Sequence, residues 1–463
     1  MRYVIQIFSF CLLLLIACGL LSCQAKTDSG AQTANSITKE SETMNQDPET
    51  DKKTESETSV TAITDAPKPI YSFDGTISEE ILCNYLSRAV TLSCEGGEEL
   101  SLSRPQYKTF ILNTGAKYIC RSACCWSPGP NDYNTYEGQA AFIRDVHQSD
   151  PDVIFEACIF ECVSKSVNSI KIPASVFEAF HMTPEDRCFS YKDMIFTDGS
   201  YVNQWGENSS VPDITRSETQ MFLYYRACSY IDLGFEGLHM GQVHLMGKND
   251  KGWTNWTGVL DLIRAYAKTH ARRHLVLLNA HTHGITDANG YLMFDFHMWP
   301  SRPKNDTAQT AHIPTADNPQ TASLTRNHID AIYGKSKGGL THSGWSTLSL
   351  PYLVELDNYG DAAAINKPTT GSNDIHVWGM DEITWFANQP AAYRAQFLRE
   401  AYAFLKDTKK NGTGFFAMPG QRVARIYDEN GKAVSWRYYA FDPSYDLRGF
   451  GDEAVIKEIW ETK

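Results

Sequence analysis

Short apolar runs alternate with amphipathic segments from residue 71 to the end of the chain. Eight of the runs have the length and composition of buried strands, at residues 88–93, 116–126, 152–163, 234–246, 273–284, 351–360, 374–383 and 412–420. Helical patterns precede most of these runs, and a long insertion rich in Gly and Thr precedes the sixth. Nearly continuous apolar strands that alternate with helices predict a parallel sheet covered on both faces.

Eight strand-and-helix units in a body of this size predict an α/β fold of the closed (β/α)8 TIM-barrel type, with loop insertions. An open doubly wound sheet is the alternative. The sequence has no G-x-G-x-x-G after the first strand, no P-loop and no G-x-S-x-G elbow. Residues 421–440, with a turn at Asn430-Gly431, predict a small C-terminal β-hairpin attached to the barrel.

The first 70 residues differ from the body. Residues 1–23 resemble a bacterial lipoprotein signal peptide, because a basic start and an apolar stretch lead to Leu20-Leu21-Ser22-Cys23. We expect Cys23 to be lipidated, with Cys18 as the alternative site and an uncleaved membrane helix as the alternative interpretation. Residues 24–70 are polar and predict a disordered tether, and residues 71–463 form the barrel. The chain is therefore expected to be exported and held at the bacterial cell envelope by its lipid.

The charge of the chain limits its expected partners, and its cysteine content indicates whether disulfides are expected. The net charge is −13, and the only basic cluster is the short H-A-R-R-H stretch at residues 270–274, so nucleic acid is not an expected partner. The body holds nine cysteines without zinc-ribbon spacing. An odd number of cysteines, several of them inside apolar runs, predicts buried thiols and not a disulfide framework.

Barrel enzymes carry their chemistry at the carboxyl ends of the strands. At those ends the sequence places four candidate catalytic acids, Glu161, Asp357, Asp381 and Glu382. The same ends and the loops beside them supply candidate substrate-binding residues, namely Arg121, Trp126, Gln242, His281, His283, Glu355 and Trp378. An ordinary turn after a strand needs one solvated polar residue. Acidic residues at three separate strand ends go beyond that requirement.

This inventory resembles that of the barrel-type glycoside hydrolases. The resemblance implies one carboxyl group acting as acid, a second acting as base or nucleophile, and aromatic rings that stack on sugars, with no cofactor or metal. The chain departs from the largest clan of these enzymes, where the fourth strand ends in an Asn-Glu pair. Here the fourth strand has no acid at its end, and Glu236 comes too early and belongs at the bottom of the barrel. Glu161 or Asp357 must then supply the acid/base group.

Other interpretations of these residues stay open. Asp381 and Glu382 could cap the helix that follows them, and Glu355 could form a buried ion pair. The alternating stretch at residues 292–303 reads as a hairpin over the rim. Three functions compete: a tethered glycoside hydrolase acting on a poly- or oligosaccharide, a glycan-binding lipoprotein without catalysis, and a metal-dependent hydrolase that uses His281, His283 and Asp357.

Overall fold

The computed structural model describes residues 70–93, 97–129, 132–306, 313–328, 330–334, 336–358 and 380–462. These residues belong to one compact unit that begins at Ile70. The expected signal peptide, the lipidation site Cys23 and nearly all of the tether lie outside the described residues. Among the helices of the described ranges, none is both long and apolar enough to cross a bilayer.

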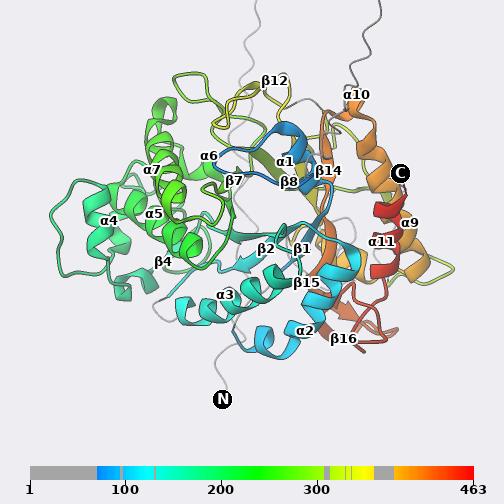
Figure 1. Ribbon diagram of the computed structural model, residues 1–463. Coiled ribbons are helices and arrows are strands. Elements are labelled where there is room, and N and C mark those ends of the chain that lie inside the picture. The colour runs from blue at the N-terminus through cyan, green and yellow to red at the C-terminus, as the bar shows by residue number, and fades with distance from the viewer. Residues whose placement is uncertain are drawn as a thin grey trace, which may run out of the picture. The chain divides into compact units, whose positions relative to one another are not determined.

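Eight parallel strands form a closed ring (Figure 1). Neighbours in the ring are paired in the order β1 (Ala89–Leu92), β2 (Tyr118–Cys124), β3 (Ile154–Cys158), β6 (Gly237–His239), β7 (Leu277–Ala280), β8 (Phe296–Pro300), β13 (Tyr352–Glu355) and β14 (Gly414–Phe416). The strand β15 (Met418–Tyr427) continues β14 after Ala417 and pairs with β1, which closes the ring. The chain is thus a TIM-type barrel, whereas an open doubly wound sheet would leave two edges.

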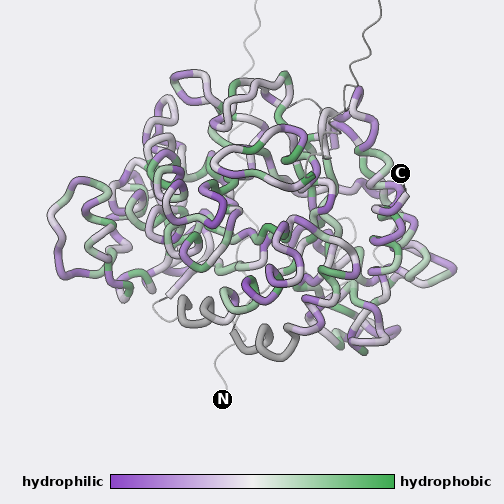
Figure 2. The backbone as a smooth tube through the Cα atoms, viewed as in Figure 1, coloured by the Kyte–Doolittle hydropathy of each residue, from purple (hydrophilic) through white to green (hydrophobic). Residues whose placement is uncertain are grey.

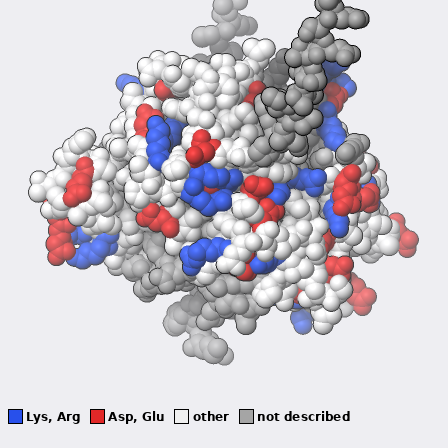
Figure 3. Space-filling model, in the orientation of Figure 1, with Lys and Arg blue, Asp and Glu red and all other residues white. Residues whose placement is uncertain are grey.

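Helices surround most of the ring. They are α2 (Gly97–Thr114), α3 (Asp132–Ser149), α5 (Ser217–Asp232), α7 (Thr254–His270), α9 (Ala391–Lys406) and α11 (Glu453–Glu461). Shorter helices are α4 (Ala174–Ala179), α6 (Val243–Met246), α8 (Glu382–Ala387) and α10 (Thr408–Asn411). Apolar and polar residues alternate along the outer helices (Figure 2), as amphipathic packing on a barrel requires. On the face shown in Figure 3, acidic and basic side chains are interspersed.

The number of barrel strands was predicted correctly, but one strand was assigned to the wrong segment. Residues 296–300, expected in a hairpin over the rim, form the sixth barrel strand β8. The run at 351–360 contains β13, which is the seventh strand and not the sixth. At the predicted seventh strand, residues 374–379 lie outside the described part, and Glu382 begins helix α8. The error arose because no helix separates β7 from β8, so the expected alternation fails there.

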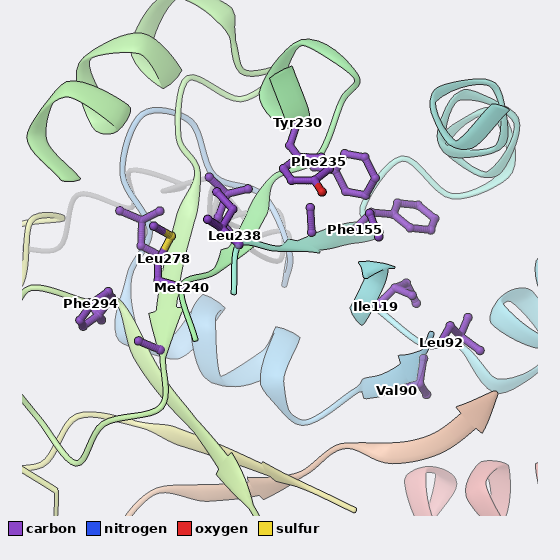
Figure 4. Close-up of a cluster of buried hydrophobic side chains, with 14 of the residues drawn as sticks. Val90, Leu92, Ile119, Phe155, Tyr230, Phe235, Leu238, Met240, Leu278 and Phe294 are labelled. Atoms are coloured by element: carbon purple, nitrogen blue, oxygen red, sulfur yellow. The ribbon is translucent and has the colours of Figure 1, made fainter. Parts of the chain in front are cut away.

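Side chains on each strand alternate between the inside of the barrel and the helix side. Tyr118, Ile154, Leu277, Phe296 and Leu353 belong to the inner cluster. The helix-facing cluster contains, among others, Val90, Leu92, Ile119, Phe155, Leu238 and Leu278 (Figure 4). Full burial of one such aliphatic side chain stabilises the fold by about 1.5–3 kcal/mol. These two layers fix the register of every strand, and with it the direction of each rim side chain.

The amino end of the barrel is closed by α1 (Glu79–Leu86). The α1 side chains Leu82, Tyr85 and Leu86 belong to the inner cluster, together with the first residues of the barrel strands. Glu236 lies at this end as expected, where Arg273 Nε donates to its Oε1 over 2.7 Å. The bottom is thus a packed plug, so any site within the barrel opens at the other end, where the strands finish.

The expected C-terminal hairpin is present. β15 pairs antiparallel with β16 (Ala433–Tyr439). The turn between them is closed by Asp428, whose N–H donates to Lys432 O over 2.9 Å. Because β15 is itself a barrel strand, the hairpin extends directly from the rim.

Candidate active site

A buried ion triplet lies at the carboxyl end of β13. Arg121 Nε donates to Glu355 Oε1 over 2.5 Å, and Arg422 Nη1 donates to Glu355 Oε2 over 3.0 Å. All three side chains are almost fully buried. Arg121 reaches inward because its backbone has a left-handed φ of 57°, within an irregular stretch of the β2–β3 pairing. Such a conformation is unfavourable for a non-glycine residue, so the fold holds Arg121 in place at a cost.

A second buried pair lies beside the triplet. Arg302 follows β8, and its Nη1 donates to Glu382 Oε1 over 2.9 Å. Ser301 Oγ donates to Glu382 Oε2 over 2.8 Å, and the Asp357 N–H donates to the same oxygen over 3.2 Å. Burial raises the pKa of Glu382 to about 7, although the Arg302 charge opposes the rise. Both carboxylate oxygens of Glu382 are therefore held by residues of the rim.

Asp381 has a local role. It is the N-cap of α8, where its Oδ1 accepts from the Thr384 N–H over 2.7 Å. Burial raises its pKa to about 6. In the described residues Asp381 caps α8 and Glu382 accepts from Arg302, which are the capping and pairing roles that the sequence left open. The strand expected before them falls on residues 374–379, outside the described part.

Asp357 is a partly accessible carboxylate at the rim. Its side chain is 14% exposed and lies between two guanidinium groups, with Oδ1 4.0 Å from Arg121 Nη2 and Oδ2 3.8 Å from Arg302 Nη1. Each arginine binds a different buried glutamate more closely than it binds Asp357. The next residue, Asn358, is fixed through its Oδ1 by Arg422 Nη2 over 2.6 Å. Asp357 is thus held between positive charges while it remains open to a ligand.

Glu161 approaches from the other side of the barrel, just after β3. Its Oε1 accepts from Gln242 Nε2 over 2.6 Å, and its Oε2 accepts from the Gln242 N–H over 2.9 Å. Burial raises the pKa of Glu161, and these hydrogen bonds and the Arg121 charge oppose the rise. Gly241, with φ +67°, makes room for the carboxylate, since a Cβ there would lie 2.2 Å from Glu161 Oε2.

Three aromatic rings stand next to Glu161, and we call them the aromatic shelf: Trp126, Phe160 and Trp205. The Trp126 ring centroid lies 5.1 Å from each of the other two. Trp205 Nε1 donates to the Glu161 carbonyl oxygen over 2.9 Å, which ties the shelf to the acid. Trp126 remains 41% exposed. An exposed indole beside a carboxyl group can bind the apolar face of a ring-shaped ligand.

A buried hydrogen-bond chain lies deeper in the barrel. Glu156 accepts from Tyr118 OH over 2.8 Å and from Asn279 Nδ2 over 2.7 Å. Asn279 Oδ1 lies 2.6 Å from His239 Nδ1, so the proton of His239 belongs on Nδ1 and its Nε2 is an acceptor. Burial lowers the pKa of His239 to about 3. His239 Nε2 and His281 Nε2 are buried without hydrogen-bond partners among the described residues, and the two rings are 4.7 Å apart.

The other predicted site residues fall in different places. Arg121, Gln242, His281 and Glu355 lie in or beside this mouth, although Arg121 and Glu355 bind each other. His283 is exposed on the loop after β7, and Trp378 lies outside the described residues. Within the described ranges, no group of three or more His, Cys, Asp or Glu side chains is arranged to hold a metal ion.

Sequence reasoning did not select Arg302, Arg422, Glu156 or His239 as site residues. Arg302 carried a signal, because Phe296, Met298, Pro300 and Arg302 are spaced two apart, as in a barrel strand. His239 carried no such signal, because it lies three residues before Gln242 and side-chain alternation would place the two on opposite faces of the strand. The arginines could not be paired with their glutamates from the sequence, because the partners are up to 234 residues apart.

No protein-family model matches the chain, and no curated protein matches it. The chain is similar to solved structures of an α-galactosidase from Thermus thermophilus (11% identity, TM-score 0.28, 44% of this chain and 42% of that one). It is also similar to an isomalto-dextranase from Arthrobacter globiformis (9%, 0.36, 81% and 56%) and to the Nostoc punctiforme debranching enzyme (11%, 0.35, 81% and 81%). All three are glycoside hydrolases. The chain spans less than half of the galactosidase, and its fold is defined by the closed ring of strands.

Proposed function

We propose that the chain is a glycoside hydrolase acting on a poly- or oligosaccharide, with Glu161 as general acid and Asp357 as base or nucleophile. One observation carries the proposal: two carboxyl groups follow the third and seventh strands at the same end of the barrel, in different electrostatic surroundings. Arg121 links the two sides, because it lies 4.0 Å from Asp357 and its charge acts on Glu161. The aromatic shelf supports a sugar ligand.

The roles follow from these surroundings. Glu161 is buried and held by the neutral amide groups of Gln242, and burial favours its protonated form, so it can give a proton to the glycosidic oxygen. Asp357 lies between two guanidinium groups, whose positive charge suits a carboxylate that attacks the anomeric carbon or removes a proton from water. The stereochemistry of the product, followed by NMR, separates these two actions of Asp357.

The test compares variants of the full chain on a panel of bacterial, plant and host glycans. Asp357→Asn and Glu161→Gln are each expected to lower kcat/KM by about 10²–10⁴-fold, the range for a positioned acid or base. Asp145→Asn is the matched control, because its carboxylate lies on the surface and is 53% exposed. Cleavage that survives both site variants would contradict the proposal.

A glycan-binding protein without catalysis is the second candidate. It is favoured by the ion pairs that occupy Glu355 and Glu382, which leave Asp357 and Glu161 for chemistry among the candidate acids of the described ranges. In that case one glycan binds equally well to the wild type and to both site variants, and Trp126→Ala removes the binding.

We also propose that Cys23 carries a lipid that tethers the chain to the cell envelope. The lipobox at residues 20–23 supports this proposal. In cells grown with labelled palmitate, the wild type should incorporate the label and Cys23→Ala should not. Equal labelling of Cys23→Ala, together with its loss in Cys18→Ala, would move the site to Cys18.

A further inference from the structure

Two thiols meet at the mouth of the barrel. Cys124 ends β2 and Cys158 ends β3, and the two residues are paired in the strand register. Their sulfur atoms are 3.6 Å apart. Paired residues on neighbouring strands have Cα atoms about 4.8 Å apart, which lies within the range that a disulfide spans.

The backbone around the two cysteines is held by a buried arginine of the helix α5. Arg226 of α5 is fully buried, and its Nη2 donates to Cys125 O and to Cys158 O, over 3.1 Å each. This one guanidinium group therefore fastens both strand ends, so the thiols stay in contact. Closing the bond needs an approach of the sulfur atoms from 3.6 Å to about 2.0 Å, and rotation of two side chains can supply it.

The surroundings allow exchange chemistry. Cys124 is partly exposed, whereas Cys158 is buried. Burial raises the pKa of Cys158, but the Arg121 charge acts on it in the opposite direction. Cys124 is thus the thiol that a small disulfide can reach, and the Cys158 sulfur lies 3.6 Å from it.

We propose that Cys124 and Cys158 form a reversible disulfide by exchange with a small-molecule disulfide. The Cys124 thiolate attacks the small disulfide, forms a mixed disulfide and releases one small thiol. The Cys158 thiolate then attacks Cys124 Sγ and releases the second small thiol. The protein loses two protons and two electrons, and the small disulfide gains them.

The bond would link two functional segments of the mouth. Trp126 of the aromatic shelf comes two residues after Cys124, and Glu161 comes three residues after Cys158. The disulfide thus joins the strand that carries the shelf to the strand that carries the proposed acid. The chemistry of the link does not depend on the proposed hydrolase activity.

The test treats the reduced full chain with oxidised glutathione and maps its peptides without reduction. The expected result is a cross-linked peptide that joins the segments around residues 124 and 158, and a loss of two free thiols that dithiothreitol reverses. Cys124→Ser and Cys158→Ser should each abolish the link. Cys125→Ser is the matched control, because it removes the adjacent thiol and should leave the link intact.

Two results would overturn the proposal: a link that persists in Cys124→Ser and disappears in Cys125→Ser, or mixed disulfides with glutathione and no internal link. Because mapping needs no substrate, its outcome is separate from any failure to find glycan cleavage. If cleavage is found, kcat/KM should differ between the oxidised and the reduced wild type. In Cys124→Ser, the oxidised and the reduced protein should have the same kcat/KM.

Discussion

The two sides of the barrel mouth hold carboxyl groups by different means. On the β8–β13 side, Glu355 and Glu382 bind buried arginines, and Asp357 lies between two of them. On the β3–β6 side, Glu161 is held by the side-chain and backbone amides of Gln242. Asp357 therefore lies next to full positive charges, whereas Glu161 accepts its hydrogen bonds from neutral amides and has its pKa raised by burial.

The largest expected effect is on the free energy of unfolding, when the buried ion triplet of Glu355 is broken. Glu355→Gln leaves Arg121 and Arg422 buried without their shared anion, and loss of one partner from a buried ion pair costs about 3–5 kcal/mol of the free energy of unfolding. Glu458→Gln is the matched control, because Glu458 pairs with Arg399 on the surface, where a pair contributes about 0–1 kcal/mol. Urea unfolding measures both changes. Equal effects of the two substitutions would mean that burial of the triplet has no influence on stability.

A smaller effect concerns pH and the buried acid Glu382. Its pKa is about 7 in the folded protein and lower in the unfolded chain, so the folded state holds the proton over more of the pH range. Its contribution is therefore most favourable at acidic pH and weakens as pH rises towards 7, by about 1.4 kcal/mol per pH unit where the difference is one proton.

The measurement compares wild type with Glu382→Gln across that pH range. The free energy of unfolding of the wild type minus that of the variant should fall from about pH 4.5 to 7. A difference is needed because buried histidines such as His239 and His297, whose pKa values lie at about 3, act in the opposite direction. A difference that stays constant would show that Glu382 is ionised throughout.

The sequence predicted the barrel because buried strands and the buried faces of helices require apolar residues at regular spacings. It failed at β8, where the connections on both sides contain no helix among the described residues, so the pattern that marks the other strands is missing. The candidate residues were found by their place at strand ends, which is how Glu161, Asp357 and Arg121 were identified. Their roles depend on partners far away in the chain, as with Arg302 and Glu382, and on backbone turns such as that of Arg121, which no local pattern shows.

The smallest expected effect concerns Glu161, which is held by neutral amide groups. Gln242→Leu removes the side-chain hydrogen bond to Glu161 and keeps the backbone one. That side-chain bond lowers the pKa of Glu161, so its loss should raise the pKa further. If Glu161 is the general acid, the alkaline limb of the pH profile of kcat/KM moves to higher pH and the acid limb stays in place. A shift of the acid limb would instead make Glu161 the base, and the contrast between charged and neutral surroundings would then no longer assign the roles of the two carboxyl groups.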